Sequence, residues 1–210
     1  MQKSVRLCQV PLASRNAVND RAKESSGDSS QPVLETNRLL LRPYRVSDAP
    51  AVQRLAGDFR IADTTLAIPH PYPDGAAEQW ISHHADAFCN GTLVAYAVTS
   101  RASGELVGTV SLMDVQAQHA RAELGYWTAV EHWGKGYCTE AVQRLISYAR
   151  EQLNVSRIVA QCLCRNPASA RVLEKAGLTR EGLLLKHMKK KERFEDVMVY
   201  GVVYQERSDA

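Results

Sequence analysis

The chain has 210 residues, a length that a single domain with an adequate core accounts for. Hydrophobic residues make up 45% of it and charged residues 23%, and the net charge of +3 is too small to indicate a nucleic-acid partner. No apolar run approaches the ~20 residues that a membrane-spanning helix needs, so no membrane association is expected. The five cysteines are an odd number without a disulfide-like spacing, which favours reduced thiols and a cytoplasmic location.

The N-terminal segment differs in composition from the rest. It is rich in Ser, Asn, Lys and Arg, and the stretch Ser25–Gln31 offers almost nothing to bury. We predict a disordered tail over residues 1–34, one domain over residues 35–205 and a short tail over residues 206–210. Because acidic residues are absent up to Asn19, an organelle transit peptide is the alternative interpretation of the first tail.

The first predicted elements are a strand and two helices. Leu39–Leu41 is typical of a buried strand. Ser47 is a candidate N-cap for a helix over Asp48–Gly57. Apolar residues at helical spacing predict a second helix over Asp74–Phe88, which Asn90-Gly91 would end.

The middle of the chain alternates strands with a strongly amphipathic helix. Leu93–Thr99 and Leu106–Met113 are predicted to form a hairpin, and Arg121–Thr128 a third strand. The apolar stripe of residues 139–153 predicts a helix, and Arg157–Leu163 has the pattern of a strand covered on both faces.

The last elements are a short helix and a hairpin. Asn166–Ala176 is predicted to be helical and to end at Gly177. Thr179–Lys186 and Val197–Tyr204 would pair around a charged turn over Lys189–Asp196. Strands and helices in this order predict one α/β domain with a mixed sheet and helices on its faces.

The segment Trp133–Ala141 (WGKGYCTEA) lies between a predicted strand and the amphipathic helix. Its glycines allow the backbone to approach a ligand, and the first N–H groups of a helix lack intrahelical partners. Together with the positive end of the helix dipole, these groups suit a pyrophosphate.

Three ligand classes compete for this loop. A nucleoside-triphosphate loop needs Ser or Thr after its lysine, whereas Gly136 follows Lys135. A dinucleotide fingerprint needs a third glycine where Thr139 stands, and an early βαβ unit. Coenzyme A, which carries a pyrophosphate without requiring a metal, remains; an ordinary turn is the alternative for so short a motif.

Two signatures stand out in the chain. The first is AELGYW at residues 122–127, followed by WGKGY at 133–137 and TEA at 139–141, and the second is NPASARVLEKAGL at 166–178. Together they resemble the GCN5-related N-acetyltransferase (GNAT) superfamily, in particular the branch with the ribosomal-protein N-terminal acetyltransferases. The similarity covers about residues 35–204. It implies a single-domain acyl-CoA N-acyltransferase fold with a V-splayed sheet, and acetyl-CoA between the strands at 121–128 and 157–163.

The resemblance also assigns roles to residues. The cofactor-binding set that it implies is Trp127 and Thr128 for the pantetheine arm, Gly134, Lys135, Gly136, Tyr137, Cys138 and Thr139 for the pyrophosphate, Asn166 for the arm and Ser169 near the thioester sulfur. No metal is expected. The family's pattern differs at Glu131, where Gln or Arg is frequent, and at Val130, where Pro is frequent. A carboxylate at Glu131 would disfavour a pyrophosphate unless it points away.

Acetyl transfer by direct attack needs a neutral amine and a proton for the leaving thiolate. Glu123 is the candidate base, and a salt-bridged strand carboxylate is the alternative. Ser169 is the candidate proton donor, with a helix-start hydroxyl as the alternative, and Tyr126 is a second candidate or a core tyrosine.

Other polar residues have simpler explanations. Cys162 and Cys164 lack the spacing and partners of a zinc site, and Cys138 is interpreted as a small loop residue. His83 and His84 would border the substrate side, with packing or surface roles favoured.

The only concentrated basic run is Lys186–Arg193, which a solvated hairpin tip explains and which does not favour nucleic acid. The sequence therefore predicts an acetyl-CoA-dependent N-acetyltransferase of a protein N-terminus or a small-molecule amine, monomeric or homodimeric. A non-catalytic acetyl-CoA-binding protein and an RNA-binding module are the rival interpretations. The segments on the acceptor side are Arg60–Trp80 and Lys186–Asp196, whose sequence does not indicate which acceptor is preferred.

Overall fold

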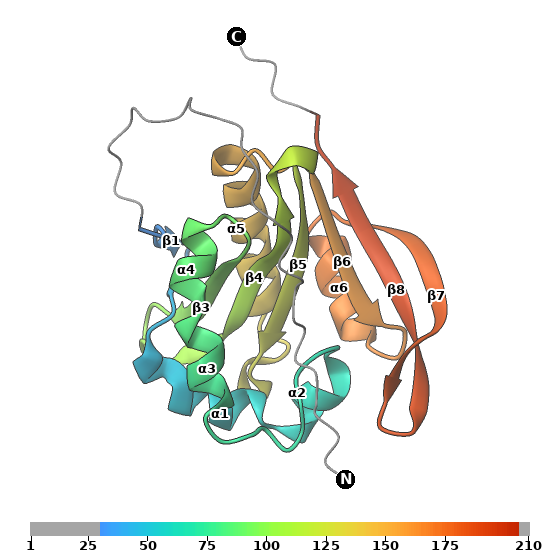
Figure 1. Ribbon diagram of the computed structural model, residues 1–210, viewed down its shortest axis with the longest axis horizontal. Coiled ribbons are helices and arrows are strands. Elements are labelled where there is room, and N and C mark those ends of the chain that lie inside the picture. The colour runs from blue at the N-terminus through green and yellow to red at the C-terminus, as the bar shows by residue number, and fades with distance from the viewer. Residues whose placement is uncertain (1–29, 206–210) are drawn as a thin grey trace, which may run out of the picture.

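A computed structural model describes residues 30–205 of the chain. Its eight strands form one sheet in the order β1-β2-β3-β4-β5-β6-β8-β7 (Figure 1). Neighbouring strands are antiparallel except β5 and β6, which are parallel. The strands are β1 Leu34–Glu35, β2 Leu39–Pro43, β3 Val94–Ser100, β4 Leu106–Gln116, β5 Arg121–Thr128, β6 Arg157–Leu163, β7 Thr179–Lys190 and β8 Arg193–Val203.

Helices cover both faces of the sheet. They are α1 Ala49–Ala56, α2 Phe59–Thr64, α3 Ala76–Ser82, α4 His84–Cys89, α5 Tyr137–Gln152 and α6 Pro167–Lys175. Helices α1 to α4 lie on one face, and α5 and α6 lie on the other (Figure 1). The predicted α/β architecture with a mixed sheet and helices on both faces is confirmed.

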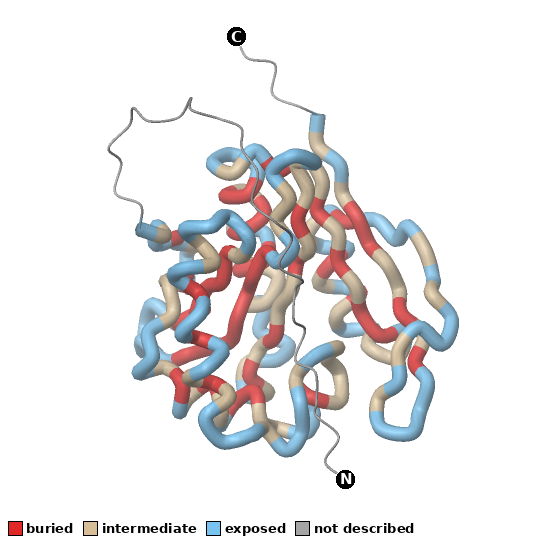
Figure 2. Tube along the Cα trace, viewed as in Figure 1, coloured by how far each residue is buried: buried red, intermediate tan, exposed pale blue. Residues whose placement is uncertain are grey.

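The core consists of two apolar clusters, one on each face of the sheet. The larger cluster packs the apolar stripe of α5, which includes Leu145 and Ile146, against strands β2 to β6. The smaller one packs α1 and α3 against β3 and β5, with Trp127 between them. Buried backbone accordingly runs through the middle of the strands, and the helix surfaces and loop tips are exposed (Figure 2). Within the described residues, no helix is long and apolar enough to cross a membrane.

The start of the first helix differs from its prediction. Ser47 lies inside a 3-10 turn, Val46–Asp48, and α1 begins at Ala49. The carboxylate of Asp48 accepts a hydrogen bond from Arg45 N at 2.8 Å and pairs with Arg42 at 2.7 Å. A charge-assisted carboxylate is a stronger hydrogen-bond acceptor than a hydroxyl, so Asp48 rather than Ser47 organises this turn.

Three further elements differ from what the sequence predicts. The single helix expected over Asp74–Phe88 is two helices, α3 and α4, which meet at His83 where His84 turns into the core. Helix α2, a single short segment, was not predicted because its six residues are too few to show a period. Strands β7 and β8 extend almost to the hairpin tip, since Lys191 adopts a left-handed φ of 54° that permits a tight turn.

Residues 1–29 and 206–210, which include most of the first predicted tail and all of the second, lie outside the described part of the chain. The ordered structure that can be described begins with a bend at Ser30, and Leu34 in β1 is buried.

Candidate active site

The two parallel strands in the middle of the sheet diverge. They pair from Arg121 opposite Arg157 to Leu124 opposite Ala160, and no further. Beyond these residues β5 continues to pair with β4, and β6 with β8. The sheet is therefore open between residues 125–128 and residues 161–163, which is the V-shaped splay expected from the sequence (Figure 1).

The edge of β5 along this opening presents backbone groups. Ala129 N donates to Val107 O in β4 at 2.8 Å, and the direction of backbone groups alternates along a strand. The N–H and C=O groups of Trp127 therefore point to β4, whereas those of Tyr126 and Thr128 point into the opening. The carbonyl of Thr128 accepts from Trp133 Nε1 at 2.7 Å, which leaves its N–H for an extended ligand.

The glycine-rich loop precedes α5 at the open end of the V. Gly134 and Gly136 have left-handed φ values of 74° and 79°, a conformation that favours glycine. The first hydrogen bond of α5 runs from Glu140 N to Gly136 O at 3.1 Å. The amides before Glu140, from Gly134 to Thr139, precede the helical ladder and need acceptors from outside it. With the positive end of a 16-residue helix, they fit the pyrophosphate that the sequence predicts here.

A polar clasp holds this loop to the turn between β1 and β2. Glu140 accepts from Thr36 Oγ1 at 2.6 Å and from Arg38 N at 3.0 Å through one oxygen, and pairs with the Arg38 guanidinium at 2.6 Å through the other. Arg38 Nη1 donates to Lys135 O at 2.9 Å, and its guanidinium lies 4.6 Å from the Tyr137 ring centroid. Although burial opposes it, hydrogen bonds from Thr36 and Arg38 hold the pKa of Glu140 below its ordinary value. The positively charged guanidinium of Arg38 therefore contacts the backbone of the loop at Lys135.

Sequence reasoning did not find this clasp. Glu140 was recognised as part of the TEA motif, but Thr36 and Arg38 lie about a hundred positions away along the chain. Nothing in the local pattern of residues 36–38 indicates such a contact. The fold brings this turn beside α5, because β1 and β2 both lie against that helix.

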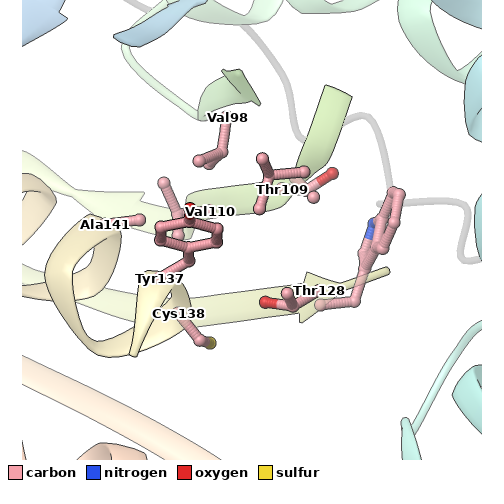
Figure 3. Close-up of a pocket in the computed structure, with 10 residues that line it drawn as sticks. Val98, Thr109, Val110, Thr128, Tyr137, Cys138 and Ala141 are labelled. Atoms are coloured by element: carbon pink, nitrogen blue, oxygen red, sulfur yellow. The ribbon is translucent and has the colours of Figure 1, made fainter. Parts of the chain in front are cut away.

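A narrow crevice lies under the loop, between β4, β5 and the first turn of α5 (Figure 3). The Tyr137 ring lies near Val110 and Ala141, and Cys138 and Thr128 line the crevice from the other side (Figure 3). Burial raises the pKa of the Cys138 thiol to about 11, with Thr128 partly opposing the shift. The thiol is thus protonated at neutral pH, which fits a small packing residue better than a nucleophile.

The second wall of the opening is made by the start of α6. The hydroxyl groups of Tyr126 and Ser169 lie 2.8 Å apart, and the Tyr126 hydroxyl is also 3.2 Å from Ser169 O. Burial raises the pKa of Tyr126 well above its ordinary value, so the phenol keeps its proton. Cys162 lies against the same hydroxyl of Ser169, and burial raises the pKa of its thiol to about 11.

Asn166 is the N-cap of α6. Its Oδ1 accepts from Ser169 N at 3.1 Å, and its Nδ2 donates to Thr64 O in α2 at 3.0 Å. Both ends of the side chain are thus engaged within the protein, and they fix the position of Ser169. The predicted contact of Asn166 with the pantetheine arm would use the remaining lone pairs of Oδ1.

Glu123 lies before the splay, in the paired part of β5 opposite Val159. Alternation along the strand places its side chain on the face of Gly125 and Trp127, opposite that of Tyr126. Burial raises the pKa of Glu123 above its ordinary value; Asp114 adds to the shift and Arg121 opposes it. The predicted base and the predicted proton donor therefore lie on opposite faces of the sheet at the opening.

The remaining candidates occupy less central positions. Glu131 is exposed. After the larger contribution of Asp58, the charge of Glu131 helps to raise the pKa of Arg60 in α2, so the Glu131 carboxylate acts on the α2 side of the loop. His83 is exposed, and His84 is 5% exposed between the rings of Tyr44 and Trp80, which supports the packing role expected for His84. Cys162 is buried and Cys164 is exposed, so the two thiols do not face one point.

These features define the acyl-CoA N-acyltransferase class of fold. The mixed sheet opens as a V between two parallel strands; the amide-rich loop and α5 follow one of these strands, and the capped helix α6 follows the other. The family model described as an acetyltransferase (GNAT) domain matches residues 38–179, more than half of the chain. The chain belongs to the GNAT family of acetyltransferases, as the two sequence signatures predicted, and is an N-acetyltransferase of that family.

Its relatives include enzymes with different acceptors. An uncharacterized N-acetyltransferase of Bacillus subtilis (strain 168) is 30% identical over 172 residues, 82% of this chain and 97% of the relative. A spermidine N(1)-acetyltransferase of Vibrio cholerae is 30% identical over 161 residues, 77% of this chain and 90% of the relative. The solved structure of a ribosomal L7/L12 α-N-protein acetyltransferase in complex with coenzyme A has a TM-score of 0.76 at 19% identity, with 82% of this chain and 98% of that chain covered, and shows the shared fold.

Proposed function

We propose that this protein transfers an acetyl group from acetyl-CoA to a primary amine, either a protein N-terminus or a small-molecule amine, by direct attack. The observation that carries the proposal is the placement of three groups around one opening. The loop at Gly134–Thr139 offers unpaired amides, the edge of β5 offers backbone at Tyr126 and Thr128, and Ser169 lies on the opposite wall. These groups suit, in that order, a pyrophosphate, a pantetheine amide chain and a thioester.

The reaction forms a bond between the amine nitrogen and the acetyl carbon and breaks the bond from that carbon to sulfur. The attacking nitrogen gives up a proton, and the departing thiolate takes one. In our proposal Glu123 receives the first proton, directly or through water. Its raised pKa improves it as a base, while its carboxylate remains the form that accepts the proton.

Ser169 supplies the second proton, and the Tyr126 hydroxyl lies 2.8 Å from the Ser169 hydroxyl. A hydroxyl alone is a weak acid. The hydrogen bond from Ser169 nevertheless stabilises the thiolate as the bond from carbon to sulfur breaks. In our proposal the Tyr126 phenol replaces the proton that Ser169 gives to sulfur, and solvent returns a proton to Tyr126. Because the two walls are fixed by β5 and the Asn166 cap, the hydroxyl groups need no rearrangement before reaction.

Product analysis tests the proposal directly. Purified protein is incubated with acetyl-CoA and a panel of amines, and both free coenzyme A thiol and the mass of the acetylated amine are measured. Equal amounts of thiol and acetylated amine support the proposal. Thiol release without any acetylated amine, or binding of acetyl-CoA without either product, would contradict it and favour the non-catalytic alternative.

A further inference from the structure

A cleft of about 680 Å³ opens between α2, the segment after it and the tip of the β7–β8 hairpin. Figure 1 shows α2 in front of the lower ends of β5 and β6, with the hairpin tip beside it. Its lining includes Phe59 and Ile68 as apolar residues and seven charged ones: Asp63, Arg165, Lys190, Lys191, Glu192, Arg193 and Glu195. Arg165 directly precedes Asn166, the cap that positions Ser169, so the cleft adjoins the proposed transfer centre.

The acidic groups of this cleft are already paired. Arg165 contacts Asp63 at 2.7 Å and Glu195 at 3.0 Å, and Glu195 is 6% exposed. Glu192 pairs with Lys189 at 2.9 Å. A polycationic ligand would therefore share these carboxylates with cations of its own sign.

Backbone acceptors at the end of α2 are also occupied. Lys190 Nζ donates to Ala62 O and Thr65 O, and Arg165 Nη2 donates to Asp63 O at 2.7 Å. Asn166 Nδ2 donates a hydrogen bond to Thr64 O. Four successive carbonyls thus accept from side chains of the opposite half of the molecule, and a polycationic ligand that approaches this row meets the cations of Lys190 and Arg165 there.

Cationic groups are in surplus at the hairpin tip. Four basic residues line the cleft against three acidic ones. Lys191 Nζ lies 4.8 Å from the Phe59 ring centroid, and the Arg193 side chain is 76% exposed and 3.8 Å from Glu195. Both cations face solvent at the mouth, where they can pair with an incoming anion.

From these contacts we propose that the cleft binds the acceptor chain behind its reacting amine, and that it favours a peptide whose N-terminal residue is followed by acidic side chains. This inference rests on the proposed acetyl transfer and names the acceptor for it. Lys191 and Arg193 pair with the peptide carboxylates, while the amine extends past Arg165 toward Ser169. A polyamine meets paired carboxylates and exposed cations of its own sign.

The test compares three peptides that share an N-terminal serine and length. They carry Asp, Asn or Lys at the second to fourth positions, and kcat/KM is measured for each with saturating acetyl-CoA; spermidine is the fourth acceptor. We expect kcat/KM for the Asp peptide to exceed that for the Asn peptide by about 10-fold at low salt, and the Lys peptide and spermidine to be poorer than both. The preference should shrink as salt screens the exposed charges.

Two variants of the same hairpin localise the effect. Lys191→Gln and Lys186→Gln each remove one positive charge, but only Lys191 lines the cleft. The Lys191 variant should lose roughly 2- to 5-fold in kcat/KM for the Asp peptide with the Asn peptide unchanged, and the Lys186 variant should match the wild type.

Each remaining result bears on the inference. Equal rates for Asp and Asn peptides, or a preference for the Lys peptide or spermidine, would overturn it while leaving acetyl transfer intact. Acetylation of none of the peptides by a protein that binds acetyl-CoA would also overturn it. Failure of the protein to bind acetyl-CoA at all would instead count against the proposed function.

Discussion

The hydroxyl of Tyr126 in β5 lies 2.8 Å from the hydroxyl of Ser169 in α6, across the point where β5 and β6 separate. The two residues are 43 positions apart in the chain. Asn166 fixes one side of the pair by capping α6, and the β4–β5 ladder fixes the other. A donor pair that is held from both sides is what proton delivery to a leaving thiolate requires.

Removing the Ser169 hydroxyl should therefore slow the chemical step. Ser169→Ala is expected to lower kcat about 100-fold, and Tyr126→Phe about 10-fold, with little change in acetyl-CoA affinity. Steady-state kinetics with a calorimetric Kd separates the two effects. Ser147→Ala on the exposed side of α5 is the control and should behave as wild type. If Ser169→Ala retained full kcat, Ser169 would be only a helix-start hydroxyl.

Glu123 should determine the acidic limb of the pH profile. A base must be deprotonated to act, so kcat/KM should fall as pH drops through the raised pKa of Glu123. Glu123→Gln should lose about 100-fold in kcat/KM at neutral pH and lose that limb as well. A variant that kept the same limb would show that another group titrates there.

A neighbouring carboxylate offers an independent check on Glu123. Asp114 raises the pKa of Glu123, after the larger contribution of burial, and Arg121 lowers it. Asp114→Asn removes the like charge and frees Arg121 from its ion pair at 2.7 Å. Both changes lower the pKa of Glu123, so the acidic limb should move to lower pH. A shift to higher pH would be incompatible with this assignment.

The Thr36–Arg38–Glu140 clasp should act on cofactor binding and not on the chemical step. Arg38→Ala removes the bonds to Lys135 O and Glu140, so the loop loses part of its support. KM for acetyl-CoA should rise about 3- to 10-fold at unchanged kcat, because a half-exposed ion pair contributes modestly. Arg54→Ala on the exposed face of α1 is the charge-matched control. A fall in kcat with constant KM would contradict a role confined to the loop.

His84 should make the fold sensitive to acid. Burial, with a smaller contribution from His83, lowers the pKa of His84 from 6.5 to about 4. Between these values the unfolded chain binds a proton that the folded chain does not, so stability falls as pH drops. Urea unfolding at pH 7.5 and pH 5 measures how much the free energy of unfolding falls between the two. This fall should be about 1–2 kcal/mol smaller in His84→Phe than in wild type. The control His119→Gln, at an exposed position, should show the same fall in the free energy of unfolding as wild type.

The sequence predicted those features that are local in the chain. The glycine pair at Gly134 and Gly136, the stripe of α5 and the short helix that starts at Asn166 each have a short-range signature, and the predicted strands at 121–128 and 157–163 match β5 and β6. Two family signatures at a fixed separation then predicted the splay between those strands. The approach of Ser169 to the thioester and the role of Glu123 as the base stay predictions.

What the sequence could not show depends on contacts between distant segments. Arg38 meets Glu140 because β1 and β2, which pair at one edge of the sheet, lie against α5, and Arg165 meets Asp63 because the segment after β6 lies against α2. Helix α2 has six residues and no periodic signal. The basic run at the hairpin tip has no pattern that shows which lysine bonds the backbone of α2; the fold assigns the hydrogen bond to Ala62 O to Lys190 and the contact with the Phe59 ring to Lys191.

The loop at Gly134–Thr139 should bind the pyrophosphate of acetyl-CoA. Calorimetric titration with acetyl-CoA tests it on wild type, Gly136→Asn and Gly136→Asp. Asn and Asp have nearly the same shape and both tolerate the left-handed φ of 79° at this position, so they differ mainly in charge. We predict micromolar binding to wild type and at least ~10-fold weaker binding to the Asp variant than to the Asn variant. Equal affinities of the two variants, or no binding to folded wild type, would contradict the account.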